Sequence, residues 1–196
     1  NAAQVRHAAR SLLDLSAEED LFGRGPLEDI SQLINNVKPV EVNFRSLAIE
    51  QGASTRLFIA MAQILKHIDA ASPIRLLIAE CENPLTVLAA IYEAKRFGIS
   101  RHVDVCPLFE TALSLDRGRR ILDVLLAQPT FREQARQRGR IAIEAGFSDA
   151  GRFMGQIPAG LAIERLQGQL ADAMTKHRLG DLDAVIFDTH GDSMGR

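Results

Sequence analysis

Apolar residues along this 196-residue chain form two recurring patterns, short continuous runs and longer stretches with helical spacing. A continuous run of about four to eight apolar residues predicts a strand that is buried on both faces. Such runs occupy residues 74–81, 103–109, 141–147 and 184–187. Stretches with helical spacing separate them and occupy residues 84–96, 117–138 and 153–178. Strands and helices that alternate in this way predict a parallel sheet covered by helices on both faces.

The part of the chain before the first apolar run has a mainly helical pattern. Apolar spacing predicts helices over residues 3–22, 27–37 and 54–68, and Ser54 or Thr55 is a candidate N-cap for the last of them. Alternation of apolar and polar residues over 40–44 predicts a strand. We therefore divide the chain into an amino-terminal helical segment, residues 1–72, and a βα segment, residues 73–196.

The βα segment has the size of about half a barrel. A closed (β/α)8 barrel takes about 250 residues, so four βα units make about half of one. The predicted fold class is therefore α/β, a partial (β/α)8 TIM-type barrel with extra amino-terminal helices. Because four units cannot close a barrel, we expect apolar strand edges that are exposed, or that are covered by the amino-terminal helices or by oligomerisation.

Composition excludes several classes of partner. The chain has 23 Lys and Arg residues against 25 Asp and Glu residues, a formal net charge of -2, so no overall field attracts nucleic acid or an anionic membrane. No apolar stretch approaches the ~20 residues of a transmembrane helix, and the first residues lack the apolar core of a signal peptide. We therefore expect a cytoplasmic protein that binds neither nucleic acid nor membrane.

The cysteines and the ends of the chain are also informative. Cys81 and Cys106 lie in apolar, strand-like runs, so we expect buried thiols in a reducing compartment rather than a disulfide. The chain begins at Asn1 without a methionine and stops at Arg196, directly after a predicted strand and a turn. These features are typical of a piece of a longer polypeptide.

Acidic residues follow two neighbouring predicted strands. Glu110 comes directly after residues 103–109, and Asp149 comes after residues 141–147. The carboxyl ends of parallel strands meet at one edge of a sheet, so we expect the two carboxylates to lie together there. Two hard oxygen ligands suit Mg²⁺ or Mn²⁺, which keeps waters and takes its other ligands from a substrate. The alternative is that these residues are helix N-caps, a role for which Ser148 and Asp149 have the right side chains.

Other charged residues give no comparable signal. No metal-binding spacing joins His67, His102 and His177, so we expect surface or capping roles for them. Seven arginines are predicted to form a solvated helix face: Arg117, Arg119, Arg120, Arg132, Arg136, Arg138 and Arg140.

Three segments at the ends of strands resemble signature segments of one enzyme family, phosphoenolpyruvate carboxylase. The sequences Pro-Leu-Phe-Glu-Thr at 107–111 and Gly-Phe-Ser-Asp-Ala-Gly-Arg at 146–152 resemble two of them. Residues 187–196 are similar to the family's phosphate-binding loop. The resemblance covers residues 74–196.

This resemblance implies a (β/α)8-barrel lyase in which Mg²⁺ or Mn²⁺ holds phosphoenolpyruvate, bicarbonate attacks its phosphate, and the enolate is carboxylated to oxaloacetate. Glu110 and Asp149 fall on the family's metal ligands. Arg152 stands where the family has a substrate-binding lysine, and Arg196 matches the loop arginine that holds phosphate and acts in catalysis. Other family residues, the general-base histidine among them, fall outside this segment. The resemblance therefore implies no activity for this segment alone. It also implies a homo-oligomer in the full-length parent.

The loop at residues 187–196 departs from the family's pattern. Asp188 replaces a histidine, His190 replaces an arginine in the substrate-binding loop, and Asp192 replaces a glycine. One misplaced unit charge about 4 Å from a phosphate costs about 4 kcal/mol at an effective dielectric constant of about 20. Two alternatives therefore stay open: a divergent metal-dependent lyase that forms another enolate, and a non-catalytic binding or regulatory module that retains the fold.

Overall fold

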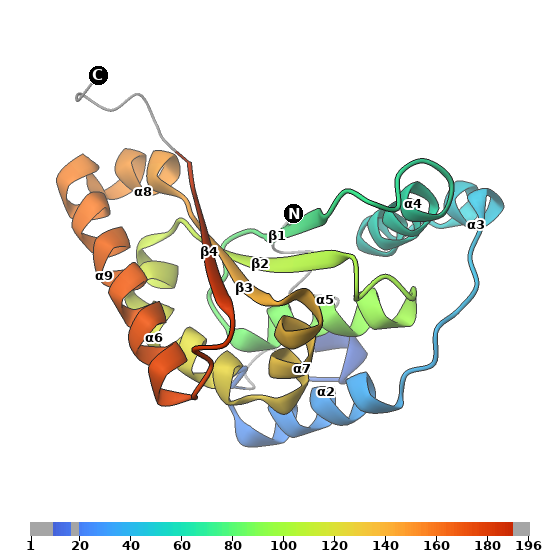
Figure 1. Cartoon of the computed structure of the whole chain (residues 1–196), viewed down its shortest axis with the longest axis horizontal. Helices are drawn as coiled ribbons and strands as arrows, with labels where there is room; N and C mark the ends of the chain where they lie inside the picture. Colours follow the sequence, from blue (N-terminus) through green and yellow to red (C-terminus); the bar gives the residue numbers. More distant parts are fainter. Residues whose placement is uncertain (1–9, 17–19, 190–196) are drawn as a thin grey trace.

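The computed structural model describes residues 10–16 and 20–189, which form a four-stranded parallel sheet with helices packed against it (Figure 1). The strands lie in the order β1-β2-β3-β4. Their bounds are Ile74–Ile78, Val103–Phe109, Arg140–Ala145 and Asp183–Asp188. All four were predicted, and the α/β class is confirmed.

Helices connect each strand to the next, as the apolar spacing predicted. They are α5 (Pro84–Arg96), α6 (Ala112–Ala127), α7 (Pro129–Arg138), α8 (Phe147–Met154) and α9 (Gln156–Lys176). The helix predicted over 117–138 is divided into α6 and α7. The helix predicted over 153–178 corresponds to α9, and most of α8 was not predicted. Pro129 ends α6 because it lacks the N–H that would continue the helix, and Gly155, at a φ angle of +90°, separates α8 from α9.

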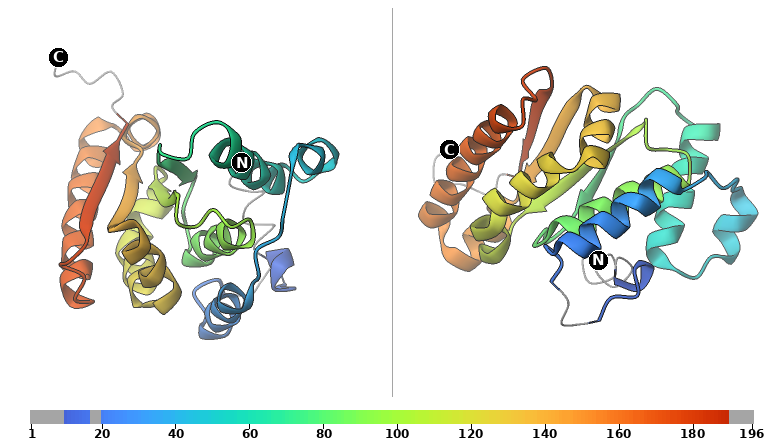
Figure 2. Two further views of the ribbon diagram at one scale, coloured as in Figure 1. Left: turned by 45° about the vertical axis from the view of Figure 1, so that its right-hand side comes forward. Right: turned by 90° about the horizontal axis from the view of Figure 1, so that it is seen from below.

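The crossover helices lie on one side of the sheet rather than on both sides. Figure 2 shows α5, α6, α7 and α9 on the same side of the strands. The strand order explains this difference from the prediction. When parallel strands follow one another in sequence, right-handed connections place every helix on the same face. The hydrophobic core lies between these helices and the sheet, and every residue of β2 is buried.

Two side chains from opposite edges of the sheet meet across its other face. The guanidinium carbon of Arg75 on β1 lies 4.3 Å from the centre of the Phe187 ring on β4. In a flat sheet these two strands would be about 14 Å apart, so both side chains lean inward over β2 and β3. Cys106, on the same face of β2, is 0% exposed, and burial raises the pKa of its thiol to about 12.

The amino-terminal helices are α2 (Arg24–Asn36), α3 (Phe44–Ile49) and α4 (Ala53–His67). Helix α2 packs against α5 through the fully buried Ile30 and Ile34. Of the helix predicted over 3–22, residues 10–12 are helical and 20–22 are not, and residues 1–9 and 17–19 lie outside the described part.

Two local predictions in this segment are wrong. Residues 40–43 form no strand, because the Asn43 side chain accepts a hydrogen bond from the Ser46 N–H at 3.0 Å and begins α3. Helix α4 begins one residue before Ser54, after the N-cap Gly52, which makes no side-chain capping bond. Ser54 and Thr55 therefore lie inside the helix.

The prediction that the cysteines are buried and form no disulfide is confirmed. Cys81 and Cys106 are both buried and both free. Burial raises the pKa of the Cys81 thiol to about 12.

Among residues 10–16 and 20–189, no helix has the length and apolar character needed to cross a lipid bilayer.

Candidate metal centre

Neither of the two predicted carboxylates serves as a helix cap. Helix α6 is capped by the Thr111 side chain, which accepts from the Ser114 N–H at 3.0 Å, so Glu110 lies just outside it. Helix α8 has Gly146 as its N-cap, with no side-chain bond, and Asp149 lies in its first turn. The capping alternative is therefore wrong for both residues.

The structure brings Glu110 and Asp149 together at the carboxyl edge of β2 and β3. Burial raises the pKa of Glu110, and the nearby charge of Asp149 and a hydrogen bond with its side chain raise it further. A hydrogen bond that the Glu80 N–H donates to the Glu110 carboxylate lowers this pKa and offsets part of the rise. Two carboxylates this close cannot both stay ionised at low cost unless a proton or a cation lies between them.

Glycine at position 146 allows the close approach of these strand ends. A Cβ atom on Gly146 would lie 2.4 Å from the Cβ of Glu110 and 3.1 Å from its Cα. Real carbon atoms do not approach so closely, so any larger residue here would displace Glu110. The Gly146 N–H also donates to the Phe109 carbonyl oxygen at 2.9 Å, which continues the pairing of β2 with β3.

Arg152 lies beside the two carboxylates. Its Nη1 atom is 3.4 Å from Oδ1 of Asp149, one turn earlier on α8. Its side chain is 70% exposed, so the guanidinium group is accessible to a ligand while it stays close to Asp149.

The altered loop begins next to this pair. Asp188, the last residue of β4, pairs with Ala145 on β3. The Thr189 carbonyl oxygen accepts from the Ser148 N–H at 3.2 Å, at the start of α8. The loop therefore leaves the sheet at the same edge as Glu110 and Asp149. His190, Asp192 and Arg196 lie outside the described residues.

The donor set fits a hard divalent cation. Magnesium is usually held by one or two carboxylates and completes its shell with waters and substrate oxygens. In the described part of the chain, no group of three or more His, Cys, Asp or Glu residues could hold a metal ion. The pair formed by Glu110 and Asp149 fits Mg²⁺ or Mn²⁺. A structural zinc site, in contrast, needs four ligands, mostly Cys and His.

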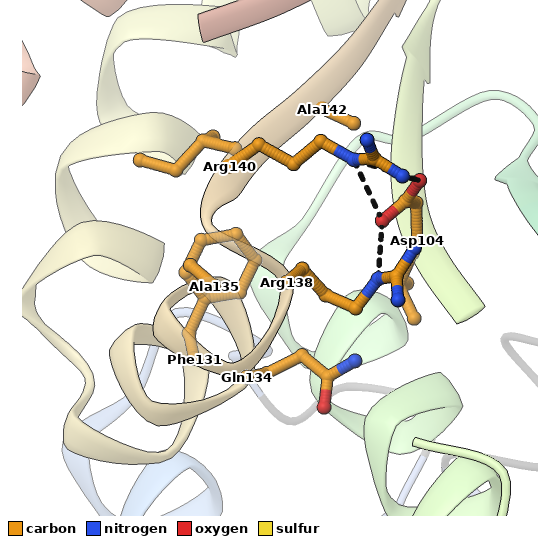
Figure 3. Close-up of a pocket in the computed structure, with 9 residues that line it drawn as sticks. Asp104, Phe131, Gln134, Ala135, Arg138, Arg140 and Ala142 are labelled. Atoms are coloured by element: carbon orange, nitrogen blue, oxygen red, sulfur yellow. Dashed lines mark hydrogen bonds and ion pairs between the residues drawn. The ribbon is translucent and has the colours of Figure 1, made fainter. Parts of the chain in front are cut away.

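A second buried charge cluster, which the sequence analysis missed, lies at the opposite edge of the sheet. Asp104 on β2 is 3% exposed, and its carboxylate accepts from Arg138 Nε at 2.7 Å and from Arg140 Nη2 at 2.7 Å (Figure 3). Burial tends to raise the pKa of Asp104, but the two arginines outweigh it and the pKa is lowered. Arg138 and Arg140 therefore do not belong to a solvated helix face, contrary to the prediction.

The Asp104 cluster has a structural role. It lines a small pocket together with Phe131 and Gln134 of α7, and it ties the end of that helix to the first residues of β2 and β3. The amino-terminal edge of such a sheet contributes to stability, whereas binding and catalysis occur at the carboxyl edge. The arginine spacing could not reveal the pair, because Asp104 is 34 residues away from Arg138.

Comparison with known proteins identifies the family. A family model described as phosphoenolpyruvate carboxylase matches residues 32–196. The chain belongs to the phosphoenolpyruvate carboxylase family. The match includes α3 and α4, so it extends further toward the amino terminus than the resemblance seen in the sequence, which began at residue 74.

Individual relatives are distant and much longer. The chain is 27% identical to the phosphoenolpyruvate carboxylase of Thermus sp. (strain 71) over 97% of its own length and 22% of the relative. It is 29% identical to the enzyme of Stutzerimonas stutzeri (strain A1501) over 96% of its length and 22% of the relative. The chain thus spans about a fifth of the length of these members of the phosphoenolpyruvate carboxylase family.

Proposed function

We propose that the full-length protein to which this chain belongs is a phosphoenolpyruvate carboxylase-like lyase, in which Glu110 and Asp149 hold Mg²⁺ or Mn²⁺. The observation that carries the proposal is that these two carboxyl groups lie within hydrogen-bonding reach of each other at the carboxyl edge of the sheet. Neither residue caps a helix, and the chain belongs to the phosphoenolpyruvate carboxylase family, whose name describes this reaction.

The proposed architecture is part of a (β/α)8 barrel. Sequential parallel strands with their helices on one side are the arrangement of a barrel wall. Residues 73–196 would then be a barrel segment and residues 1–72 an amino-terminal helical segment. We further propose that the full-length protein is a cytoplasmic homo-oligomer.

The residues of the chain have distinct proposed roles. Glu110 and Asp149 would hold the cation, which when bound neutralises negative charge that develops on an enolate. Arg152 would bind the phosphate or carboxylate of phosphoenolpyruvate from the exposed side of α8. His190 and Arg196 would contribute to the substrate loop, and bicarbonate would be the second substrate.

A second candidate function follows from the loop. Asp188 ends β4 at the same edge as the two carboxylates, where an additional negative charge disfavours a phosphorylated acid. A lyase that forms an enolate from another acid, or a binding module without catalysis, would tolerate this charge.

The test is oxaloacetate formation by the full-length protein, measured with phosphoenolpyruvate, bicarbonate and Mg²⁺. We expect Glu110→Gln and Asp149→Asn each to remove at least 99% of the turnover, a loss of roughly the size expected when a key electrostatic group is removed. The matched controls Glu164→Gln and Asp172→Asn change exposed residues of α9 and should leave turnover unchanged. Full activity in either site variant would refute the metal role.

A further inference from the structure

Glu80, in the turn after β1, has a backbone conformation that is uncommon for a residue with a side chain. Its φ angle is +46°, in the left-handed region that residues other than glycine seldom occupy. Among the non-glycine residues that the structure describes, only Asp14 and Arg178 share this conformation. Such backbone strain persists where the surrounding structure fixes it, and it is concentrated at functional sites.

The surrounding structure fixes this turn on both sides. Before the turn, β1 pairs with β2. After it, the Cys81 N–H donates to the Leu108 carbonyl oxygen at 3.0 Å, and Asn83 accepts from the Thr86 N–H at 3.0 Å to cap α5. The chain therefore has to turn sharply at Glu80 to leave the strand and enter the helix.

The turn directs the backbone N–H of Glu80 at the side chain of Glu110. The N–H donates to Oε1 of Glu110 at 3.0 Å. The Glu110 carboxyl group also makes a hydrogen bond with the Asp149 side chain. The backbone of Glu110 is held by the buried Ser114 hydroxyl, which accepts from its N–H at 3.1 Å. The bond from Glu80 is therefore the main-chain contact that directs the carboxylate, in addition to its side-chain partner Asp149.

We propose that Glu80 is a positioning residue, whose left-handed backbone orients the Glu110 carboxylate toward Asp149 and a divalent cation. This inference rests on the metal site proposed above. The group that orients the carboxylate is the main-chain N–H, so the conformation at position 80 decides its direction. The charge of the Glu80 side chain acts separately and adds to the raised pKa of Glu110. Hydrogen bonds of this kind to a metal ligand fix its orientation, and their loss typically weakens metal binding about 10–100-fold.

The test measures Mn²⁺ binding to the 196-residue chain by electron paramagnetic resonance. Glu80→Gly keeps the N–H and adopts positive φ without strain, so we expect an affinity within about twofold of wild type. Glu80→Val disfavours positive φ, so we expect binding about tenfold weaker. Arg178→Val changes a residue with φ of +56° in the turn after α9, so it should lose comparable stability and bind Mn²⁺ like wild type.

A second measurement needs no metal. Both substitutions remove the charge of the Glu80 side chain, so the ¹³C signal of the Glu110 carboxyl group in Glu80→Val should be shifted relative to its position in Glu80→Gly. A signal at the same position in both variants together with wild-type affinity in Glu80→Val would overturn the proposal, as would equal weakening in Arg178→Val. If the wild-type chain binds no Mn²⁺, the proposed metal site is wrong, and the carboxyl signal alone then decides whether Glu80 positions Glu110.

Discussion

At the scale of single residues, Gly146 controls how closely Glu110 and Asp149 approach. A Cβ at this position would lie 2.4 Å from that of Glu110, so Gly146→Ala should displace Glu110, cost about 1–3 kcal/mol of stability and weaken Mn²⁺ binding. Gly151→Ala is the matched control: its Cβ would meet Gln156 at an ordinary 3.8 Å, so it should gain about 0.5–1 kcal/mol and bind normally. Urea unfolding and Mn²⁺ titration check both, and equal behaviour of the two variants would contradict the steric argument.

Asp104 supports a prediction about stability and pH. Replacing it by Asn leaves Arg138 and Arg140 without their counter-charge. Removing one partner of a buried ion pair usually costs about 3–5 kcal/mol, and we expect about 2 because both arginines keep some contact with water. Asp123→Asn, which weakens the contacts of the partly exposed Asp123 with Lys176 and His177, should cost less than Asp104→Asn, about 1 kcal/mol.

The pH dependence follows from the lowered pKa of Asp104. A carboxylate whose folded-state pKa is lowered stabilises the fold above its unfolded value, about 3.9, and loses this contribution as pH falls further. Urea unfolding at pH 7, 5 and 3.5 should therefore show the wild-type advantage over Asp104→Asn intact at the first two values and reduced at the third. A difference in the free energy of unfolding between wild type and Asp104→Asn that grows as the pH falls would contradict this explanation.

Residue roles differ in how far the sequence reveals them. Glu110 and Asp149 could be found because Glu110 directly follows a recognisable strand and Asp149 lies a few residues after the next one. The role of Gly146 could not, since it depends on a contact with a neighbouring strand. The role of Asp104 could not be found either, because its partners Arg138 and Arg140 come from α7 and β3.

At the scale of elements, the packing of α6 against α9 depends on a glycine. A Cβ on Gly118 would lie 2.5 Å from Cδ1 of Leu166, which is 0% exposed. We expect Gly118→Ala to lose about 1 kcal/mol, because overpacking exceeds the gain in helix propensity. Gly168→Ala, with no atom within 4 Å of its Cβ, should gain about 0.5–1 kcal/mol. Thermal unfolding that shows the same stabilisation in both variants would mean that the helices separate without cost.

Element boundaries were predicted best where local chemistry determines them. The predicted ranges of α5 and β2 agree with the structure, because Asn83 and Pro84 begin the helix and β2 is apolar at every position except Asp104. The strand predicted over 40–44 was wrong because alternation in a short stretch competes with the capping preference of Asn43.

At the scale of the whole molecule, the altered loop decides between the candidate functions. Replacing Asp188, His190 and Asp192 together by the family's His, Arg and Gly restores positive charge to this loop. If the parent binds a phosphorylated acid, the triple variant should bind phosphoenolpyruvate at least tenfold more tightly at pH 8, where an ordinary histidine is neutral. Binding to the wild-type parent should itself strengthen toward pH 6 as His190 becomes cationic. Unchanged affinity and turnover at every pH would favour the binding-module alternative.

The most direct test of the account measures Mn²⁺ binding to the chain itself, by the loss of the free-ion paramagnetic signal during titration. The account predicts one bound ion in the wild-type chain, at least tenfold weaker binding in both Glu110→Gln and Asp149→Asn, and wild-type binding in Glu164→Gln. A wild-type chain that binds no Mn²⁺, or site variants that bind it as tightly as wild type, would contradict the proposal that these two carboxylates form a metal centre.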